Sequence, residues 1–397
     1  MGEKLLTIKP IEKAFFIFVF LTIAVMSRIL LYPEVFPDFV QFLNPWLNAL
    51  REYGLVAINN GISNYNTPYL LLLWLFSRVI PSNLAVIKTI ALISDILMAV
   101  GVFKTVEIFK PEGFTKYLAA LSLPILPTVA YNSAAWGQCD GIMGMLAIWA
   151  IFFCLKDKLH FSWILAGIAF AVKMQGVFLA PFLLAISVNR RKTFITGPLL
   201  AVASCFIFST PTLIRGDTLE RIFGVFVDGS GAMFGVKHLS WWMSNLCQWF
   251  PNQYYDEFRF ITIGIGFAIV VLLVIYGLRS RIFSNERCLL IASFCLIVLP
   301  FVLPQMHGRY YYQGEIALFV LAFILPRTAW FVYIIQMVTM STFFIANTGV
   351  DRDNWAFRIL SIGVLAILVG LIRMNSSLVK SEANNDLLEE ENERVLR

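Results

Sequence analysis

Long apolar runs separated by short polar segments make up most of this 397-residue chain. A helix needs about 20 apolar residues to cross the hydrocarbon core of a bilayer, and somewhat fewer where the bilayer thins. The pattern therefore predicts an all-α, polytopic membrane protein. The apolar runs cover approximately residues 14–32, 66–80, 83–104, 116–131, 141–155, 160–173, 177–189, 193–213, 257–278, 288–304, 314–326, 329–346 and 356–373.

Composition supports the same class. Hydrophobic residues make up 59% of the chain and charged residues 14%, which leaves too little polar surface to coat a water-soluble globule of this size. No stretch is long enough for a separate soluble domain, so residues 1–397 are interpreted as one membrane domain. The net charge of +6 comes from basic residues at the ends of apolar runs, which disfavours a nucleic-acid partner.

The basic residues also predict topology, because Lys and Arg in short loops favour the cytoplasmic side. Successive loops alternate between basic and less basic, as spans that cross in turn require, only if segment 66–80 does not cross. We therefore expect a juxtamembrane or re-entrant helix there. About twelve spans result, with both termini cytoplasmic and an uncleaved first helix. Residues 33–65 and 214–256 become long extracytoplasmic loops, and 375–397 a cytoplasmic tail. The residues placed in the cytoplasm are Lys104, Lys110, Lys116, Lys156, Lys158, Arg190, Arg191, Lys192, Arg279, Arg281, Arg287, Arg327 and Arg373.

The six cysteines form no CxxC pair, and most lie inside apolar runs. We therefore expect ordinary buried thiols rather than disulfides or a metal site. The cysteines are Cys139, Cys154, Cys205, Cys247, Cys288 and Cys295.

Four polar clusters fall on the extracytoplasmic side of this topology, which predicts one site. A carboxylate can act as general base toward a hydroxyl, and Lys, His and Arg can hold a phosphate. This combination favours transfer of a group from a phosphorylated lipid to a hydroxyl. The candidates are Asp38 as base; Arg309, His307 and Lys173 as phosphate ligands; Asp140, Gln138 and Gln175 as an acceptor or second acidic site; and Trp46, Trp136 and Tyr310 as aromatic contacts to sugar or lipid.

Each candidate also has a structural interpretation. Asp38 and Asp140 are each followed by a predicted helix and could serve as its N-cap. Lys173 could extend to the membrane interface, and His307 and Arg309 could form a structural hydrogen-bond cluster at the end of a span. A divalent metal shared by Asp38 and Asp140 stays open.

Two further features lie outside these clusters. Asp95 lies inside an apolar run, and we expect it to pair with a neighbouring span. The small-residue run Asp228-Gly229-Ser230-Gly231-Ala232 is either a segment that closes over a lipid or a plain connector.

Five motifs occur in order between about residues 30 and 315, and together they carry a resemblance. The set resembles the membrane-embedded GT-C glycosyltransferases and is most similar to bacterial proteins related to GPI mannosyltransferase II. Thr67, Met174 and Gly308 depart from the pattern of that family. The motifs are Asp38 with Phe42-Leu43-x-Pro45-Trp46; Tyr65-Asn66-x-Pro68-Tyr69; Asn132-x-x-x-Trp136-Gly137-Gln138-x-Asp140; Lys173-x-Gln175; and Met306-His307-x-Arg309-Tyr310.

The resemblance implies an inverting transfer of a hexose, with mannose favoured, from a polyprenyl-phosphate sugar. The acceptor would be a hydroxyl of a glycan, lipid or protein on the extracytoplasmic face of a bacterial plasma or inner membrane, and Asp38 would be the catalytic base. Two other classes remain as alternatives. A transporter or flippase for lipid-linked sugars would normally show ionisable groups near the midplane and paired halves, and no matching halves are visible in the sequence. A non-catalytic subunit of an envelope assembly is the third.

Overall fold

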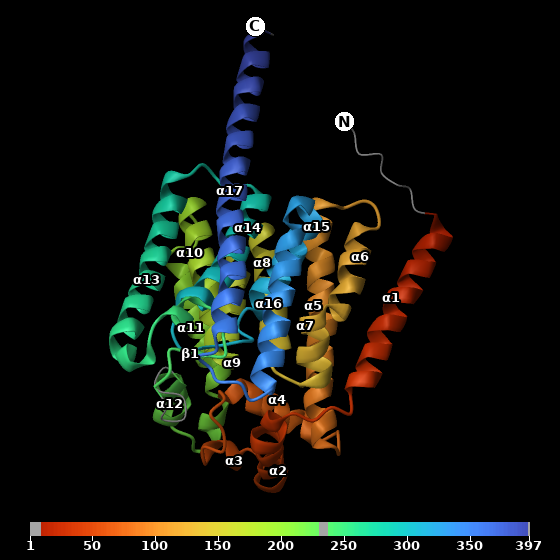
Figure 1. The fold of residues 1–397 in the computed structure, drawn as a ribbon, viewed down its shortest axis with the longest axis vertical. Helices are drawn as coiled ribbons and strands as arrows, with labels where there is room; N and C mark the ends of the chain where they lie inside the picture. The colour runs from red at the N-terminus through yellow and green to blue at the C-terminus, as the bar shows by residue number, and fades with distance from the viewer. Residues whose placement is uncertain (1–8, 230–236, 396–397) are drawn as a thin grey trace.

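Roughly parallel helices make up most of the protein (Figure 1). The computed structural model describes residues 9–229 and 237–395, and the side chains of 9–224 and 237–384. Helix α1 (Pro10–Leu31) begins at one end of the bundle. Helix α17 (Trp355–Val395) ends at the same end, and its last turns project beyond the other helices. We call this end the terminal end and the opposite one the loop end.

Seven stretches within the described residues are long and apolar enough to cross a membrane. A pair of shorter helical stretches, Thr115–Ile125 and Pro127–Ala135, bent by 49°, would make an eighth span. The chain therefore has the helices of an all-α polytopic membrane protein. The seven stretches contain α1, α5 (Asn83–Phe109), α11 (Thr196–Ser209), α13 (Tyr255–Arg279), α14 (Asn285–Val302), α16 (Ala329–Asn347) and α17.

Five shorter apolar stretches occur in the same described part of the chain. Each of the twelve runs predicted to cross coincides with a helix or with the bent pair, whereas the number that cross stays a prediction. The helices of these stretches are α4 (Thr67–Ser77), α8 (Asp140–Leu155), α9 (Leu159–Val172), α10 (Leu179–Asn189) and α15 (Tyr312–Ile324). The bent pair contains α6 (Thr115–Ser122) and α7 (Pro127–Ala130), and the single-turn helices are η1 (Phe39–Leu43), η2 (Leu123–Ile125), η3 (Tyr131–Ala135), η4 (Met174–Phe178), η5 (Pro211–Arg215), η7 (Leu246–Trp249), η8 (Asn252–Tyr254) and η9 (Pro326–Thr328).

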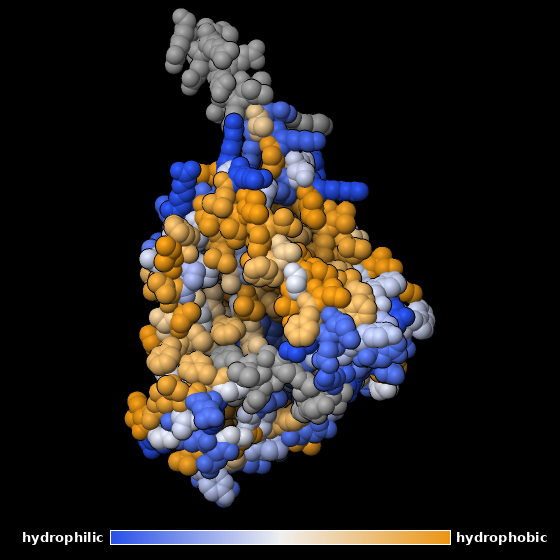
Figure 2. Space-filling model, turned by 90° about the vertical axis from the view of Figure 1, so that its left-hand side faces the viewer, coloured by the Kyte–Doolittle hydropathy of each residue, from blue (hydrophilic) through white to orange (hydrophobic). Residues whose placement is uncertain are grey.

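The core and the periphery of the bundle differ in burial. Most of α14 and α15 is buried, whereas α1 has no buried residue in its helix and stands at the edge of the bundle (Figure 1). Apolar side chains also cover most of the middle of the face shown in Figure 2, with hydrophilic residues toward its two ends. An exposed apolar band between polar ends is the arrangement that a bilayer requires.

The first predicted loop folds into short helices at the loop end, with α2 (Asn44–Tyr53) and α3 (Val56–Asn59) beside α4. Arg51 of α2 fixes this layer to α5, because its guanidinium donates to the Ile80 carbonyl at 2.6 Å and to Asn83 Oδ1 at 2.8 Å. Another short helix at the loop end, α12 (Leu219–Gly229), belongs to the second predicted loop.

Two structural expectations are confirmed. Asp95 pairs with another helix, because its Oδ2 lies 2.7 Å from an Arg28 nitrogen of α1 and accepts from Ser133 at 2.5 Å. All six cysteines are free and buried. The predicted Asp228–Ala232 run reaches into residues 230–236, which lie outside the described residues.

Candidate functional site

Asp38 lies just before the single turn η1, at the loop end of the bundle. Its Oδ2 accepts a hydrogen bond from Gln138 Nε2 at 3.0 Å and lies 3.5 Å from an Arg309 guanidinium nitrogen. It makes no side-chain cap to the helix that follows, so the capping interpretation is wrong. The side chain is 37% exposed, which leaves this carboxylate reachable from outside the protein.

Asp140 is positioned by a reversal of the chain at Gly137. Gly137 has φ +67°, a conformation that costs glycine little, and it lets the chain turn from η3 into α8. Asp140 is the first residue of α8 and does not cap it; its two oxygens accept from Lys173 Nζ at 2.8 Å and from Asn132 Nδ2 at 3.2 Å. The Asp140 side chain is only 5% exposed, so these contacts hold a buried charge.

Lys173 lies between α9 and η4, and its ammonium pairs with the buried Asp140 carboxylate at 2.8 Å instead of extending freely into the surroundings. Its ammonium also lies over the rings of Tyr65, at 5.6 Å, and Tyr310, at 5.3 Å. Burial by itself would lower the Lys173 pKa, but the adjacent Asp140 carboxylate outweighs burial and raises it. Lys173 is therefore a cation at neutral pH.

Arg309 joins the two acids. Its guanidinium lies 3.5 Å from Asp38 and its Nε 3.4 Å from Asp140 Oδ2, while its central carbon lies 5.3 Å from the centre of the Trp136 ring. The result is an alternating series in space, which we call the charge chain: Gln138, Asp38, Arg309, Asp140 and Lys173. Two carboxylates balance two cations, which is how charges with little solvent contact are tolerated.

His307 lies beside the charge chain without joining it. It belongs to the two-residue strand β2 (Met306–His307), and its ring centre lies 6.0 Å from that of Tyr310 and 6.3 Å from that of Trp242. Burial, followed by the positive charges of Arg309 and Lys173, lowers the pKa of His307 well below 6.5. The ring is therefore neutral at pH 7 and offers a hydrogen bond rather than a charge to a ligand.

The position between His307 and Arg309, Gly308, has no room for a side chain. A Cβ at this position would lie 2.5 Å from Thr342 Cγ2 and 2.7 Å from the Trp242 carbonyl oxygen. The backbone must approach this closely because the Gly308 N–H donates to the Trp241 carbonyl at 3.3 Å. A residue with a side chain does not fit here unless Thr342 or the backbone at Trp242 moves.

A parallel pairing of two short strands holds His307 and Arg309 in place. Strand β1 (Ser240–Trp241) pairs with β2, so that Ser240 lies beside Met306 and Trp241 beside His307. The pairing is extended by the Gln305 N–H, which donates to the Leu239 carbonyl at 2.7 Å.

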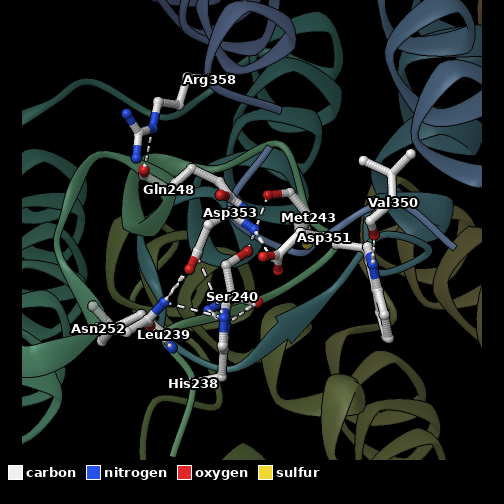
Figure 3. Close-up of polar contacts among 11 residues, drawn as sticks. His238, Leu239, Ser240, Met243, Gln248, Asn252, Val350, Asp351, Asp353 and Arg358 are labelled. Carbon is white, nitrogen blue, oxygen red and sulfur yellow. Dashed lines mark hydrogen bonds and ion pairs between the residues drawn. The ribbon is translucent and has the colours of Figure 1, made fainter. Parts of the chain in front are cut away.

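Strand β1 is in turn anchored by polar contacts at the start of α17 (Figure 3). Asn252 is central: its Nδ2 donates to Asp353 Oδ1 at 2.8 Å and lies 3.0 Å from His238 Nε2, and its Oδ1 accepts from the Leu239 N–H at 2.8 Å. Arg358 of α17 donates to the Gln248 carbonyl at 2.8 Å. A segment of the second predicted loop thereby becomes a fixed support for β2.

The other predicted residues lie around this core at different distances. Gln175 does not enter the charge chain: its backbone carbonyl accepts from Gln313 at 3.4 Å, and its buried Oε1 has no hydrogen-bond partner among the described residues. Trp46 packs on Tyr65 with ring centres 5.4 Å apart and so lies behind the aromatic contact of Lys173.

Two residues outside the predicted site also take part in the charge chain's surroundings. Asn132 donates to Asp140, and Tyr65 lies under Lys173. Both belong to motifs of the resemblance, and the polar Asn132, eight residues before Asp140 at the end of an apolar run, is the signal that sequence reasoning could have used.

Several buried polar atoms near the charge chain have no hydrogen-bond partner within the described residues. Native proteins rarely leave such atoms unpaired, and they are expected where a ligand binds. No group of three or more His, Cys, Asp or Glu side chains able to hold a metal occurs in the described part of the chain. The atoms without a hydrogen bond include Asn132 Oδ1, Trp136 Nε1, Gln175 Oε1, His307 Nδ1 and Arg309 Nε, the last of which still lies 3.4 Å from Asp140 Oδ2.

No protein-family model matches this chain, and no curated protein matches it.

Proposed function

We propose that this protein is an inverting, GT-C type glycosyltransferase that moves a hexose, with mannose favoured, from a polyprenyl-phosphate sugar to an acceptor hydroxyl. The observation that carries the proposal is the charge chain, in which a partly exposed carboxylate, Asp38, adjoins the buried Arg309, and Asp140 links Arg309 to Lys173. A base beside fixed cations is what displacement of a phosphate leaving group requires.

In this reaction Asp38 acts on the acceptor. The acceptor oxygen bonds to the anomeric carbon as the bond from that carbon to the phosphate oxygen breaks, and polyprenyl phosphate leaves. Asp38 takes the proton from the acceptor hydroxyl. Gln138 holds the carboxylate at 3.0 Å and so fixes the direction from which the hydroxyl approaches. Attack from the side opposite the phosphate inverts the anomeric centre.

Arg309 and Lys173 act on the phosphate. Each is already paired with a carboxylate, yet Arg309 Nε has no hydrogen bond among the described residues, and an ammonium has three donors. Negative charge grows on the leaving phosphate oxygen in the transition state, and donors fixed beforehand stabilise it there. His307, neutral at pH 7, would add a hydrogen bond. Asp140 orients both cations, and Gln175 would contact the acceptor.

The proposed membrane placement follows from the charge pattern of the sequence. We place the terminal end in the cytoplasm and the loop end on the extracytoplasmic face of a bacterial plasma or inner membrane, with twelve spans and α4 as a juxtamembrane helix. The charge chain then lies where an extracytoplasmic acceptor would reach it. This placement is tested by labelling single cysteines introduced at Val79 and at Lys380 with a membrane-impermeant reagent, after the native cysteines have been replaced. We expect only the first to be labelled from outside.

The catalytic proposal is tested with labelled polyprenyl-phosphate hexose and purified protein reconstituted into sealed vesicles. Asp38→Asn should lower transfer by about 10²–10⁴-fold, the range for loss of general base catalysis. Glu34→Gln, four residues earlier and exposed, is the matched control and should leave transfer unchanged. Full transfer by Asp38→Asn would contradict the proposal, as would label that crosses the membrane without appearing in a product.

A further inference from the structure

An open groove lies between α16 and α17, away from the charge chain, and has a volume of about 670 Å³. The two helices run side by side (Figure 1). The lining is mostly apolar, but it includes two arginines. The residues that matter here are Arg327, Trp330, Phe331, Ala366, Arg373 and Ser377.

The groove continues along the same pair of helices. A second open groove of about 250 Å³ is lined by Tyr333, Met337 and Ile359, among others, and every residue that lines it is apolar or aromatic. From Arg373 to Ile359 the rise along α17 is about 21 Å, more than half of the roughly 30 Å hydrocarbon core. We call the two grooves together the α16–α17 seam. It has a charged end and a long apolar end.

The two arginines of the seam are exposed and are not neutralised by a neighbouring acid. No ion pair of Arg327 or Arg373 occurs within the described residues. The first acidic residue after Arg373 on α17 is Glu382, and its carboxylate lies 2.9 Å from Arg287 instead. The charged end of the seam therefore carries two positive charges next to an apolar track.

Close packing behind the seam makes its shape a fixed feature of the fold. A Cβ at Gly370 of α17 would lie 2.5 Å from Phe331 Cε1 of α16, so the helices meet there with no room for a side chain. Contacts through small residues are the usual way in which membrane helices approach closely. The groove thus lies over closely packed helices, with Gly370 and Phe331 in its lining.

We propose that the α16–α17 seam binds one anionic glycerophospholipid of the bilayer leaflet at the terminal end. Its phosphate lies between Arg327 and Arg373, each able to donate two hydrogen bonds to phosphate oxygens. One acyl chain follows the seam past Ala366 toward Ile359. The occupant is an anionic lipid because its headgroup complements the two arginines while its chain matches the apolar track. This site is independent of the proposed transfer reaction.

The test uses the full chain in detergent, titrated with phosphatidylglycerol or phosphatidylcholine of identical acyl chains and measured by native mass spectrometry. Wild type should bind one phosphatidylglycerol in preference to phosphatidylcholine. Arg327→Gln with Arg373→Gln should weaken phosphatidylglycerol binding about 30-fold, which corresponds to about 2 kcal/mol at about 1 kcal/mol for each basic residue. Both positions are exposed, so folding should be retained.

Two further variants keep the result interpretable. Lys156→Gln with Arg279→Gln removes two exposed charges from other helices and should leave binding unchanged. Ala366→Trp keeps both arginines, fills the groove at an exposed position and should also weaken binding. Equal binding of the two lipids, equal losses in the two charge variants, or a dimer of this chain that Ala366→Trp abolishes would each overturn the proposal.

Discussion

Among the arginine–aspartate pairs of the described residues, the pair that joins α1 to α5 and the pair at Asp38 have different surroundings. In the structural pair, Arg28 and Asp95 lie 2.7 Å apart and Asp95 has a side-chain exposure of 2%. In the charge chain, Arg309 and Asp38 lie 3.5 Å apart and Asp38 is 37% exposed. A tight, closed pair holds helices together, whereas a looser pair with an accessible carboxylate and unpaired neighbours is suited to bind a ligand.

The largest effect is expected from Asp140→Asn, which removes the carboxylate between two buried cations. Removal of one partner of a buried ion pair costs about 3–5 kcal/mol, so the thermal unfolding temperature in detergent should fall strongly. The double variant Asp140→Leu with Lys173→Met should recover part of that stability because it leaves only Arg309 to be compensated, and Arg309 retains Asp38. Sugar transfer should be lost in both. Stability equal to wild type in Asp140→Asn would show that the charge chain is not held as described.

A smaller effect on stability is expected from Gly308→Ala, which places a Cβ against Thr342 and the Trp242 carbonyl. Overpacking of this kind costs about 1–3 kcal/mol, and the displaced β2 should also lower transfer. Thr342→Ser removes the closer of the two contacts and should restore part of both properties in the double variant. Unfolding curves and transfer rates measured on the same preparations check this, and an unchanged Gly308→Ala protein would speak against the tight strand pairing.

Gln138→Leu removes the hydrogen bond that holds Asp38. A hydrogen bond to a charged group contributes about 1.5–3 kcal/mol, and a loss of that size in the transition state lowers the rate by about 10–150-fold. Gln138→Glu, which adds a negative charge beside Asp38, should be at least as harmful. If Gln138→Leu transferred sugar at the wild-type rate, Asp38 would not depend on Gln138 for its orientation.

The smallest effect concerns pH and His307. Because its folded pKa lies well below the unfolded value of about 6.5, the unfolded state takes up a proton first as the pH falls. His307 therefore contributes nothing to the pH dependence of stability above about pH 7, and it destabilises the fold as the pH falls below 6.5. Unfolding temperatures of wild type and His307→Gln, compared between pH 7.5 and 5, should diverge toward acid, with wild type losing more. Parallel curves would contradict the lowered pKa.

The sequence was sufficient to predict the helices and the convergence of the polar clusters. Apolar runs locate helices because their length and composition are local properties, and charge alternation places Asp38, Asp140, Lys173 and Arg309 at one end. The sequence was not sufficient to predict that cations and carboxylates alternate along the charge chain. The partner of Lys173 is set by the packing of α8 against α9, which no local pattern reveals. The pairing of β1 with β2 joins segments some 65 residues apart, and no local pattern marks either strand.

The most direct measurement compares Asp38→Asn with Asp95→Asn at equal amounts of folded protein, with transfer of labelled sugar from a polyprenyl-phosphate donor as the readout. We predict that Asp38→Asn keeps its unfolding temperature and loses transfer by about 10²–10⁴-fold. Asp95→Asn should unfold at lower temperature, because Arg28 loses its partner, and yet transfer sugar normally while folded. Retained transfer in Asp38→Asn, or an equal loss in both variants, would contradict the assignment of the charge chain as the site.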